Sequence, residues 1–220
     1  MTIEVYWGSG SPFAWRGLLT LEVKRLQYVS HLLQFSKNEH KSPEFLGMNP
    51  RGKVPVVKDG DFVVYESLAI MKYLDDKHPE PSLFGRSPET SAQIMMSVCE
   101  CVSYIETPIV NIVRPIFFGG IDDRREEMIS AASVLREEYS LLNARLTGRR
   151  WVIGDSITAA DIMLYPQTAV LLRALGKEQA AALDLKLMPL ADRFPAVTQW
   201  MKNVEALPGY DKTYPPHWRQ

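Results

Sequence analysis

Cysteine is scarce in this chain, and that scarcity limits what the protein can be. The 220 residues include two cysteines, Cys99 and Cys101. Two positions apart on a helix, they point to nearly opposite sides and cannot bridge each other. Few cysteines favour a reducing compartment, and residues 1–7 lack the basic and then apolar pattern of a secretory signal. We therefore expect a cytoplasmic protein.

Long apolar runs and a charge excess are also missing. No run approaches the roughly 18 apolar residues of a membrane-spanning helix, so no membrane partner is predicted. The 25 basic and 26 acidic residues give a net charge of −1, which argues against a nucleic-acid partner. The four histidines are scattered without ligand spacing, so no metal site is predicted. What is present is an ordinary globular composition, 46% apolar and 23% charged.

The first part of the chain mixes strand and helix patterns. Residues 3–6 alternate like a strand, a helix containing Trp15 follows, and residues 28–33 predict a second strand. This strand–helix–strand order is typical of a parallel pair. Residues 54–57 and 62–65 predict two short strands that are joined by a hairpin at Asp59-Gly60, and Ser67 then opens a helix.

The second part of the chain is helical throughout. We predict a helix from Ser87-Pro88 that extends to Ile105. Further helices are predicted over residues 122–146, from Thr158 to near Gly176, after Lys177, and from Phe194-Pro195 to Pro208-Gly209. We place the first domain at residues 1–80, a linker at 81–88 and the all-helical domain at 89–220.

Thr158-Ala159-Ala160-Asp161 is the clearest local signal in the helical part. Thr158 and Asp161 stand at the two positions of a capping box, in which each side chain satisfies a backbone amide of the other residue. Ile157 and Ile162 occupy the positions of a hydrophobic staple. We therefore interpret Asp161 as a structural residue and not as a catalytic acid.

Three segments of the first part could carry chemistry. The loop Gly8-Ser9-Gly10-Ser11 precedes a helix start, where free amides and a hydroxyl can stabilise an anion. Glu66-Ser67 stands at a second strand–helix junction and could hold an ammonium and a carboxylate, and Lys53 could pair with another carboxylate. Taken singly, the serines could be simple helix caps and Lys53 a solvated side chain. Together they suit an elongated zwitterionic peptide with a reactive group at its middle.

The motifs resemble those of the cytosolic glutathione transferases over nearly the whole chain. Residues 11–16, SPFAWR, look like the serine motif of the zeta and tau classes. By this motif the chain resembles a serine-type, zeta/tau-like bacterial member of the family. Residues 50–57 resemble the segment around the family's cis-proline, and residues 65–70 resemble its Glu-Ser turn. Residues 158–161 resemble the capping box of its core helix. The resemblance implies a thioredoxin-like α/β domain followed by an all-helical domain, glutathione as co-substrate, no metal, and a homodimer.

The resemblance also implies roles for individual residues. Ser11 would activate the thiol, with Ser9 as the alternative hydroxyl, and Arg16 would lie near the sulfur. The residues that would bind glutathione are Lys41, Lys53, Val54, Pro55, Glu66 and Ser67. A small hydrophobic electrophile would bind between the domains, where the candidate residues are Phe13, Tyr104, Arg114, Phe117 and Phe118. Pro55 would follow a cis peptide bond.

Two departures from related classes narrow the reaction. Position 13 is Phe where zeta members have Cys, which weakens an assignment as a maleylacetoacetate isomerase. Position 11 is Ser where omega-like thiol-exchange enzymes have Cys, and a serine cannot form a mixed disulfide. Conjugation of glutathione to electrophiles is therefore the leading prediction. The alternatives are a glutathione-dependent isomerase or dehalogenase, favoured by Arg16 and Trp15, and a non-catalytic binding module with the same fold.

Overall fold

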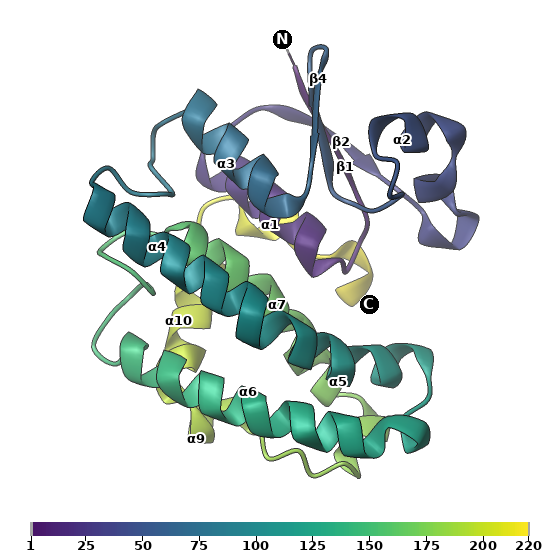
Figure 1. The fold of residues 1–220 in the computed structure, drawn as a ribbon, viewed down its shortest axis with the longest axis vertical. Coiled ribbons are helices and arrows are strands. Elements are labelled where there is room, and N and C mark those ends of the chain that lie inside the picture. Colours follow the sequence, from purple (N-terminus) through teal and green to yellow (C-terminus); the bar gives the residue numbers. More distant parts are fainter. Residues whose placement is uncertain (1, 220) are drawn as a thin grey trace. The chain divides into compact units, whose positions relative to one another are not determined.

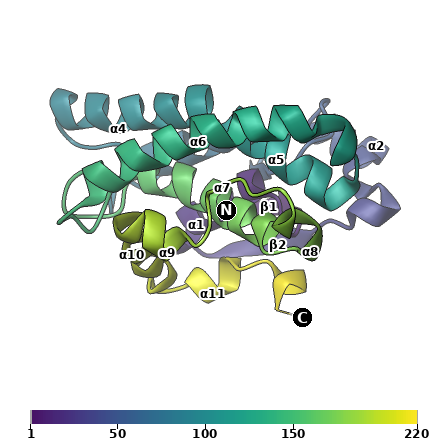
Figure 2. The same cartoon turned by 90° about the horizontal axis from the view of Figure 1, so that it is seen from below.

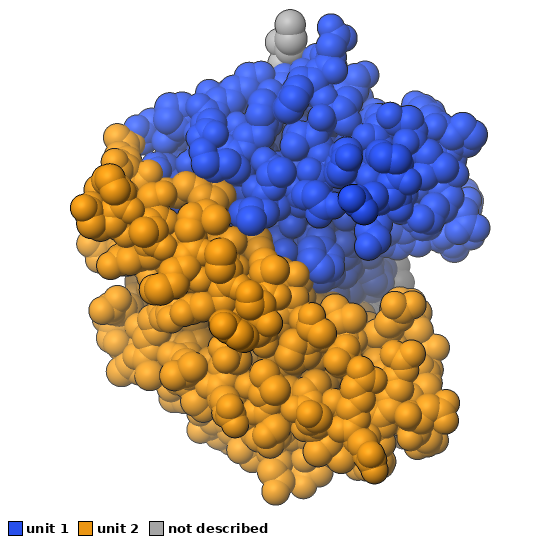
Figure 3. All heavy atoms as spheres, viewed as in Figure 1, with its two compact units in different colours: residues 1–83, 206–220 blue, residues 84–205 orange. Residues whose placement is uncertain are grey.

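Two compact units make up the computed structural model, which describes residues 2–219. Figure 3 colours them separately: one contains the chain up to residue 83 together with the stretch from residue 206 onward, and the other contains residues 84–205. The sequence-based division assigned the stretch from 206 to the helical domain. That stretch groups with the first unit because its aromatic side chains pack around Trp15.

A four-stranded sheet forms the centre of the first unit. Its strands are β1 (Ile3–Trp7), β2 (Tyr28–Leu32), β3 (Val56–Asp59) and β4 (Phe62–Tyr65). The strand order is β2-β1-β3-β4. β1 and β2 are parallel, which confirms the prediction, and β3 and β4 form the predicted antiparallel hairpin. β3 begins at Val56 and not at Val54 as predicted. The peptide bond between Val54 and Pro55 is cis, as the resemblance implies.

Helices pack on the sheet face that carries Ile3, Val5 and Trp7. The helices of this unit are α1 (Pro12–Val23), α2 (Pro43–Met48), α3 (Ser67–Lys77) and α11 (Tyr210–Thr213). Short 3-10 turns occupy Phe35–Lys37, Glu39–Lys41 and Pro216–Trp218. α1 and α3 lie against each other (Figure 1), and Leu18, Leu21, Ile70 and Leu74 join the strand residues in one core. This packing holds the starts of α1 and α3 in a fixed relation to the sheet.

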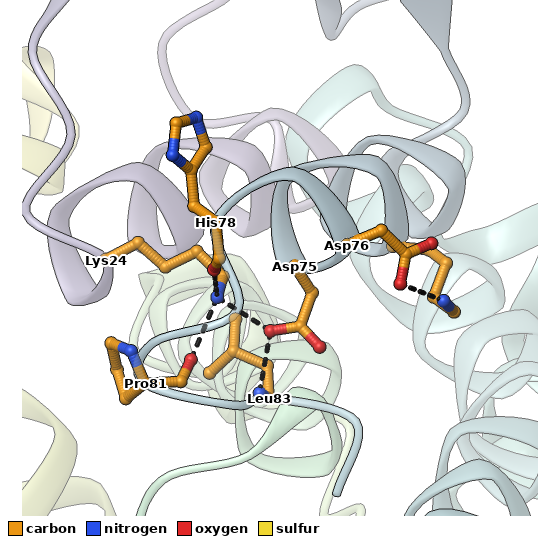
Figure 4. Close-up of polar contacts among 7 residues, drawn as sticks. Lys24, Asp75, Asp76, His78, Pro81 and Leu83 are labelled. Atoms are coloured by element: carbon orange, nitrogen blue, oxygen red, sulfur yellow. Dashed lines mark hydrogen bonds and ion pairs between the residues drawn. The ribbon is translucent and has the colours of Figure 1, made fainter. Parts of the chain in front are cut away.

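Lys24 anchors the segment that follows α3. Its ammonium lies 2.6 Å from Asp75 Oδ1 and donates to the carbonyls of His78 and Pro81 at 2.7 and 2.8 Å (Figure 4). The same Asp75 oxygen accepts the amide of Leu83 at 2.8 Å. One buried ion pair therefore fixes the chain from the end of α3 to Leu83.

The second unit consists of helices. They are α4 (Pro88–Glu100), α5 (Glu106–Phe118), α6 (Arg125–Leu146), α7 (Ala159–Leu175), α8 (Glu178–Ala181), α9 (Leu190–Arg193) and α10 (Pro195–Glu205), with a 3-10 turn at Asp122–Arg124. α7 is buried along most of its length and contacts α4, α5 and α10. Of the helices that the structure describes, none is long and apolar enough to cross a bilayer.

The helix start at α7 confirms the predicted capping box. Asp161 Oδ2 accepts the amide of Thr158 at 2.8 Å, and Oδ1 accepts the amide of Val152 at 3.0 Å and the indole N–H of Trp200 at 2.8 Å. Asp161 is fully buried. Burial raises the pKa of this carboxyl, and its hydrogen bonds oppose that rise. The side chain ties α10 and the loop before α7 to the helix start, which is a structural role.

The sequence placed some helix boundaries wrongly. The helix predicted from Pro88 to Ile105 changes at Cys101 into a π-helical turn, Cys101–Ile105, and the chain then continues as α5. The helix predicted over residues 122–146 begins with a 3-10 turn, and α6 starts at Arg125. The predicted fifth helix ends at Glu205. α2, α5, α9 and α11 were not predicted.

Candidate functional site

The loop between β1 and α1 presents a serine hydroxyl at a helix N-terminus. Ser11 is the N-cap residue of α1, and its Oγ accepts the amide of Ala14 at 3.2 Å. The amide of Ser11 donates to the carbonyl of Gly8 at 3.2 Å, and Gly10 has a φ of 82°, a conformation that favours glycine. A hydroxyl accepts and donates at the same time. Ser11 therefore caps the helix as an acceptor, and its O–H group can still donate a hydrogen bond to an anion at the same helix end.

Ser9, in the same loop, has a different partner. Its Oγ lies 2.5 Å from Nδ1 of His217, which follows α11 near the end of the described chain. The sequence analysis named no role for His217. The pair joins residues 208 positions apart, so no local pattern could have indicated it.

The junction of β4 and α3 carries Glu66 and Ser67. Glu66 has a φ of 68°, a strained conformation for a residue that is not glycine and one that often occurs at ligand sites. Ser67 is buried, and Arg16 Nη1 lies 3.5 Å from its Oγ. The Arg16 guanidinium is itself buried and lies 5.0 Å from the centre of the Phe13 ring. The structure thus brings Phe13, Arg16 and Ser67 together.

Lys41 and Lys53 flank the loop that leads to the cis-proline. Lys41 Nζ donates to the carbonyl of Arg51 at 3.4 Å, and Lys53 is exposed. Asn49 Nδ2 donates to the carbonyl of Lys53 at 2.6 Å, which holds the loop just before Val54. Two lysines therefore stand beside a backbone segment that precedes β3.

The other electrophile-site candidates belong to the second unit. Tyr104 lies in the π-helical turn and is 55% exposed, and Arg114, Phe117 and Phe118 lie on α5. Phe118 has 82% of its surface exposed, more than any other large apolar side chain within residues 2–219. Phe13 belongs to the first unit. Tyr104 also lines a cavity of about 120 Å³ with Glu100, Glu138 and Arg145, which the sequence analysis did not anticipate.

Charge within that cavity is partly compensated. Arg145 Nη1 lies 2.8 Å from Glu100 Oε2 and donates to Ser97 Oγ at 2.6 Å. Burial, followed by the charges of Glu100 and Glu137, raises the pKa of Glu138. Across residues 2–219, no cluster of three or more His, Cys, Asp or Glu side chains could hold a metal ion.

Comparison with known proteins gives consistent matches. Residues 10–77 match the glutathione S-transferase N-terminal domain family, and residues 104–208 match the glutathione S-transferase C-terminal domain family. Glutathione S-transferase A of Pleuronectes platessa is 31% identical, and the alignment covers 98% of this chain and 92% of that protein. The crystal structure of a glutathione S-transferase from the Antarctic clam Laternula elliptica superposes with a TM-score of 0.84, at 32% identity over 100% of this chain and 95% of that one.

The fold and the family matches together define a glutathione-dependent transferase with a thioredoxin-like α/β unit and an all-helical unit. Both units match the same family, and a relative above 30% identity covers almost the whole chain. The chain belongs to the glutathione S-transferase family. Glutathione is its co-substrate.

Proposed function

We propose that the protein ionises glutathione with the Ser11 hydroxyl and directs the thiolate at small hydrophobic electrophiles. The observation that supports this role is the position of Ser11 at the N-terminus of α1, with its proton available. The hydroxyl donates to the sulfur and stays protonated, so serine is neither the nucleophile nor a general base. The helix start adds its partial positive charge.

The magnitudes are sufficient for this mechanism. A free thiol with a pKa of about 8.5 is roughly 3% ionised at pH 7. Lowering that pKa by about two units requires roughly 2.7 kcal/mol of preference for the thiolate. A hydrogen bond to a charged group contributes roughly 1.5–3 kcal/mol, and a helix N-terminus adds about 0.3–1 kcal/mol. One serine and one helix start are therefore enough.

The rest of the tripeptide has suitable partners in the first unit. Glu66 would pair with the γ-glutamyl ammonium and Ser67 would hold its carboxylate. The Val54 backbone, next to Pro55, would pair with the cysteinyl part, and Lys53 and Lys41 would bind the glycyl carboxylate. Arg16 would act on the γ-glutamyl end through Ser67, because its guanidinium lies 3.5 Å from the Ser67 hydroxyl.

The electrophile would be held by apolar and aromatic side chains. Phe13, Tyr104, Phe117 and Phe118 offer such surfaces, and Arg114 could stabilise charge on a leaving group. An apolar site favours hydrophobic electrophiles. Family members typically dimerise, and we propose a homodimer that works in the cytoplasm.

The finer class assignment rests on the motif alone. Ser11 and Arg16 within SPFAWR support a serine-type, zeta/tau-like bacterial member. The two relatives described above come from animals. The zeta/tau-like class is therefore a proposal that rests on Ser11 and Arg16, and it names no particular electrophile.

Ser11→Ala tests the proposed function directly. We expect a 10- to 100-fold loss of kcat/KM for conjugation of a chloronitrobenzene, from the loss of about 1.5–3 kcal/mol of thiolate stabilisation. Binding to immobilised glutathione should persist, because the other contacts are intact. Near-normal turnover by this variant would remove Ser11 from the mechanism.

Ser87 provides a matched control. It is the N-cap of α4, is followed by proline as Ser11 is, and its Oγ accepts the amide of Thr90 at the same 3.2 Å. Ser87→Ala should destabilise the fold by about 1 kcal/mol, as loss of a cap does, and leave conjugation unchanged. Equal losses of activity in the two variants would mean that Ser11 acts only as a cap.

A further inference from the structure

The stretch after residue 205 is built onto the start of α1. The Trp15 indole N–H donates to Thr213 Oγ1 at 2.8 Å, and both side chains are buried. The Trp15 ring packs edge to face against Tyr214 and Trp218, with centroid distances of 5.8 and 5.5 Å. Figure 2 shows α11 and the residues that follow it in yellow, and α11 contacts α1. The position of the segment is therefore set by buried contacts.

This packing brings His217 to the loop that carries Ser11. Nδ1 of His217 lies 2.5 Å from Ser9 Oγ. A β-carbon at Gly10 would lie 2.8 Å from Cε1 of the same imidazole and 3.4 Å from the Trp218 indole nitrogen. The glycine thus allows the imidazole and indole to approach the backbone closely. Ser9 and Gly10 immediately precede Ser11, the proposed hydrogen-bond donor to the thiolate.

The hydroxyls of Ser9 and Ser11 are the two candidates in this loop for a hydrogen bond to the glutathione sulfur, and they have different partners. Ser11 accepts a backbone amide, and that bond leaves its proton free. Ser9 faces an imidazole nitrogen, which in the neutral ring without a proton on Nδ1 accepts the Ser9 proton. In that tautomer the single Ser9 proton is bound by the imidazole, so Ser9 cannot also give it to a thiolate.

We propose that His217 is a positioning residue for thiolate formation: it binds the Ser9 hydroxyl, fixes the Gly8–Ser11 turn, and leaves Ser11 as the donor to the glutathione sulfur. This inference rests on the proposed function and adds a residue to it. His217 does not touch the sulfur; it acts through Ser9. Without the pair, the turn loses its side-chain tether to the C-terminal segment, and the Ser11 hydroxyl is held less firmly against the thiol.

The test compares His217→Ala, Ser9→Ala and the double variant in the full-length protein. We expect each single change to lower kcat/KM for chloronitrobenzene conjugation about three- to tenfold, the range of one hydrogen bond. The double variant should be no worse than either single one, because both remove the same interaction. Ultraviolet titration of bound glutathione should show its thiol pKa raised by about 0.5–1, which matches that fold-change.

Two further variants separate positioning from general stability. His217→Asn can keep an amide acceptor near the position of Nδ1 and should restore much of the activity that His217→Ala loses. Lys212→Gln, in the same segment, replaces an ammonium that lies 3.2 Å from Glu22 Oε2, near the C-terminal end of α1, with a neutral amide. It should leave activity and the thiol pKa unchanged.

Several results would overturn the inference. A His217→Ala variant with a normal thiol pKa and normal kcat/KM would do so. A Ser9→Ala variant that loses most activity while Ser11→Ala keeps it would make Ser9 the donor. Failure of the proposed function is distinguishable, because the unmodified protein would then show no acidified thiol in the bound complex.

Discussion

At the scale of single residues, Lys24 and Asp75 form a buried ion pair that also binds backbone groups of the segment after α3. The Lys24 side chain has no exposed surface and that of Asp75 has 9%. Besides each other, they bind two carbonyls and one amide of the segment after α3. A buried pair of this kind contributes little relative to an apolar replacement of both partners, but removal of one partner leaves an uncompensated charge.

Lys24→Ala should therefore lower the free energy of unfolding by about 3–5 kcal/mol. The loss has two sources: the unpaired Asp75 carboxylate, and the carbonyls of His78 and Pro81 that lose their donor. Urea unfolding at neutral pH measures it. A loss below about 1 kcal/mol would contradict the buried network.

An exposed lysine on the same helix as Asp75 is the matched control. Lys72 pairs with Asp76 one turn along α3, and both side chains are more than half exposed. Because exposed pairs contribute about 0–1 kcal/mol, Lys72→Ala should change the unfolding free energy by no more than that. The comparison isolates burial, since the charge removed is the same.

At the scale of elements, the start of α7 depends on one carboxylate. Asp161→Ala would leave the amides of Val152 and Thr158 and the indole N–H of Trp200 without their acceptor inside the protein. We expect a loss of about 3–5 kcal/mol in the free energy of unfolding, measured by urea denaturation of the variant and the parent.

Asp155→Ala is the control for that prediction. Asp155 lies in the same loop before α7 but is exposed, so its removal should change stability by less than about 0.5 kcal/mol. If the two aspartates gave equal losses, the capping box would not be what holds the start of α7.

The same element shows what the sequence could predict. A capping box lies within four residues, so Thr158 and Asp161 predicted the helix start without any knowledge of tertiary structure. The break after Glu100 could not be predicted in this way. The π-helical turn keeps helical backbone on both sides, and residues 101–105 contain neither glycine nor proline to mark it. α2 and α11 are too short for their periodicity to be visible.

The site was predictable to the same extent. Ser11 and the Glu66-Ser67 pair stand at strand–helix junctions that local patterns indicate. The partner of Ser9 could not be found this way, because His217 reaches it only when the last part of the chain packs on Trp15. The sequence carries no local signal for that contact.

At the scale of the whole molecule, acid should destabilise the fold through Asp59. Its side chain is 1% exposed. A hydrogen bond from Lys77, and a second from Tyr73 at 2.9 Å, hold the pKa of Asp59 below its ordinary value of 3.8. The unfolded chain therefore binds more protons than the folded chain near that pH. Stability from this group is fully present above about pH 4 and is lost as the pH falls through the lower, folded pKa.

Asp59→Asn tests this pH dependence. At pH 7 the variant should be less stable by about 1–3 kcal/mol, the range for hydrogen bonds to a charged group. The difference from the parent protein should shrink as the pH falls from about 4 through the lower, folded pKa of Asp59, because the carboxylate of the folded parent becomes protonated over that range. Urea unfolding at a series of pH values gives both curves. A difference that stays constant down to the acid limit of folding would exclude Asp59 as the titrating group.

The grouping of residues from 206 onward with the first unit has a consequence for biosynthesis. A ribosome makes the chain from its N-terminus, and domains generally fold as they emerge. The first unit cannot be finished in that order, because the aromatic cover of Trp15 is translated only after the whole second unit. A nascent chain that stalls at residue 205 holds its sheet and α1 but has no imidazole beside Ser9. On the proposal that His217 positions this turn, full thiol activation should be the last property that the newly made protein acquires, and Ser11 alone would supply the earlier, weaker activation.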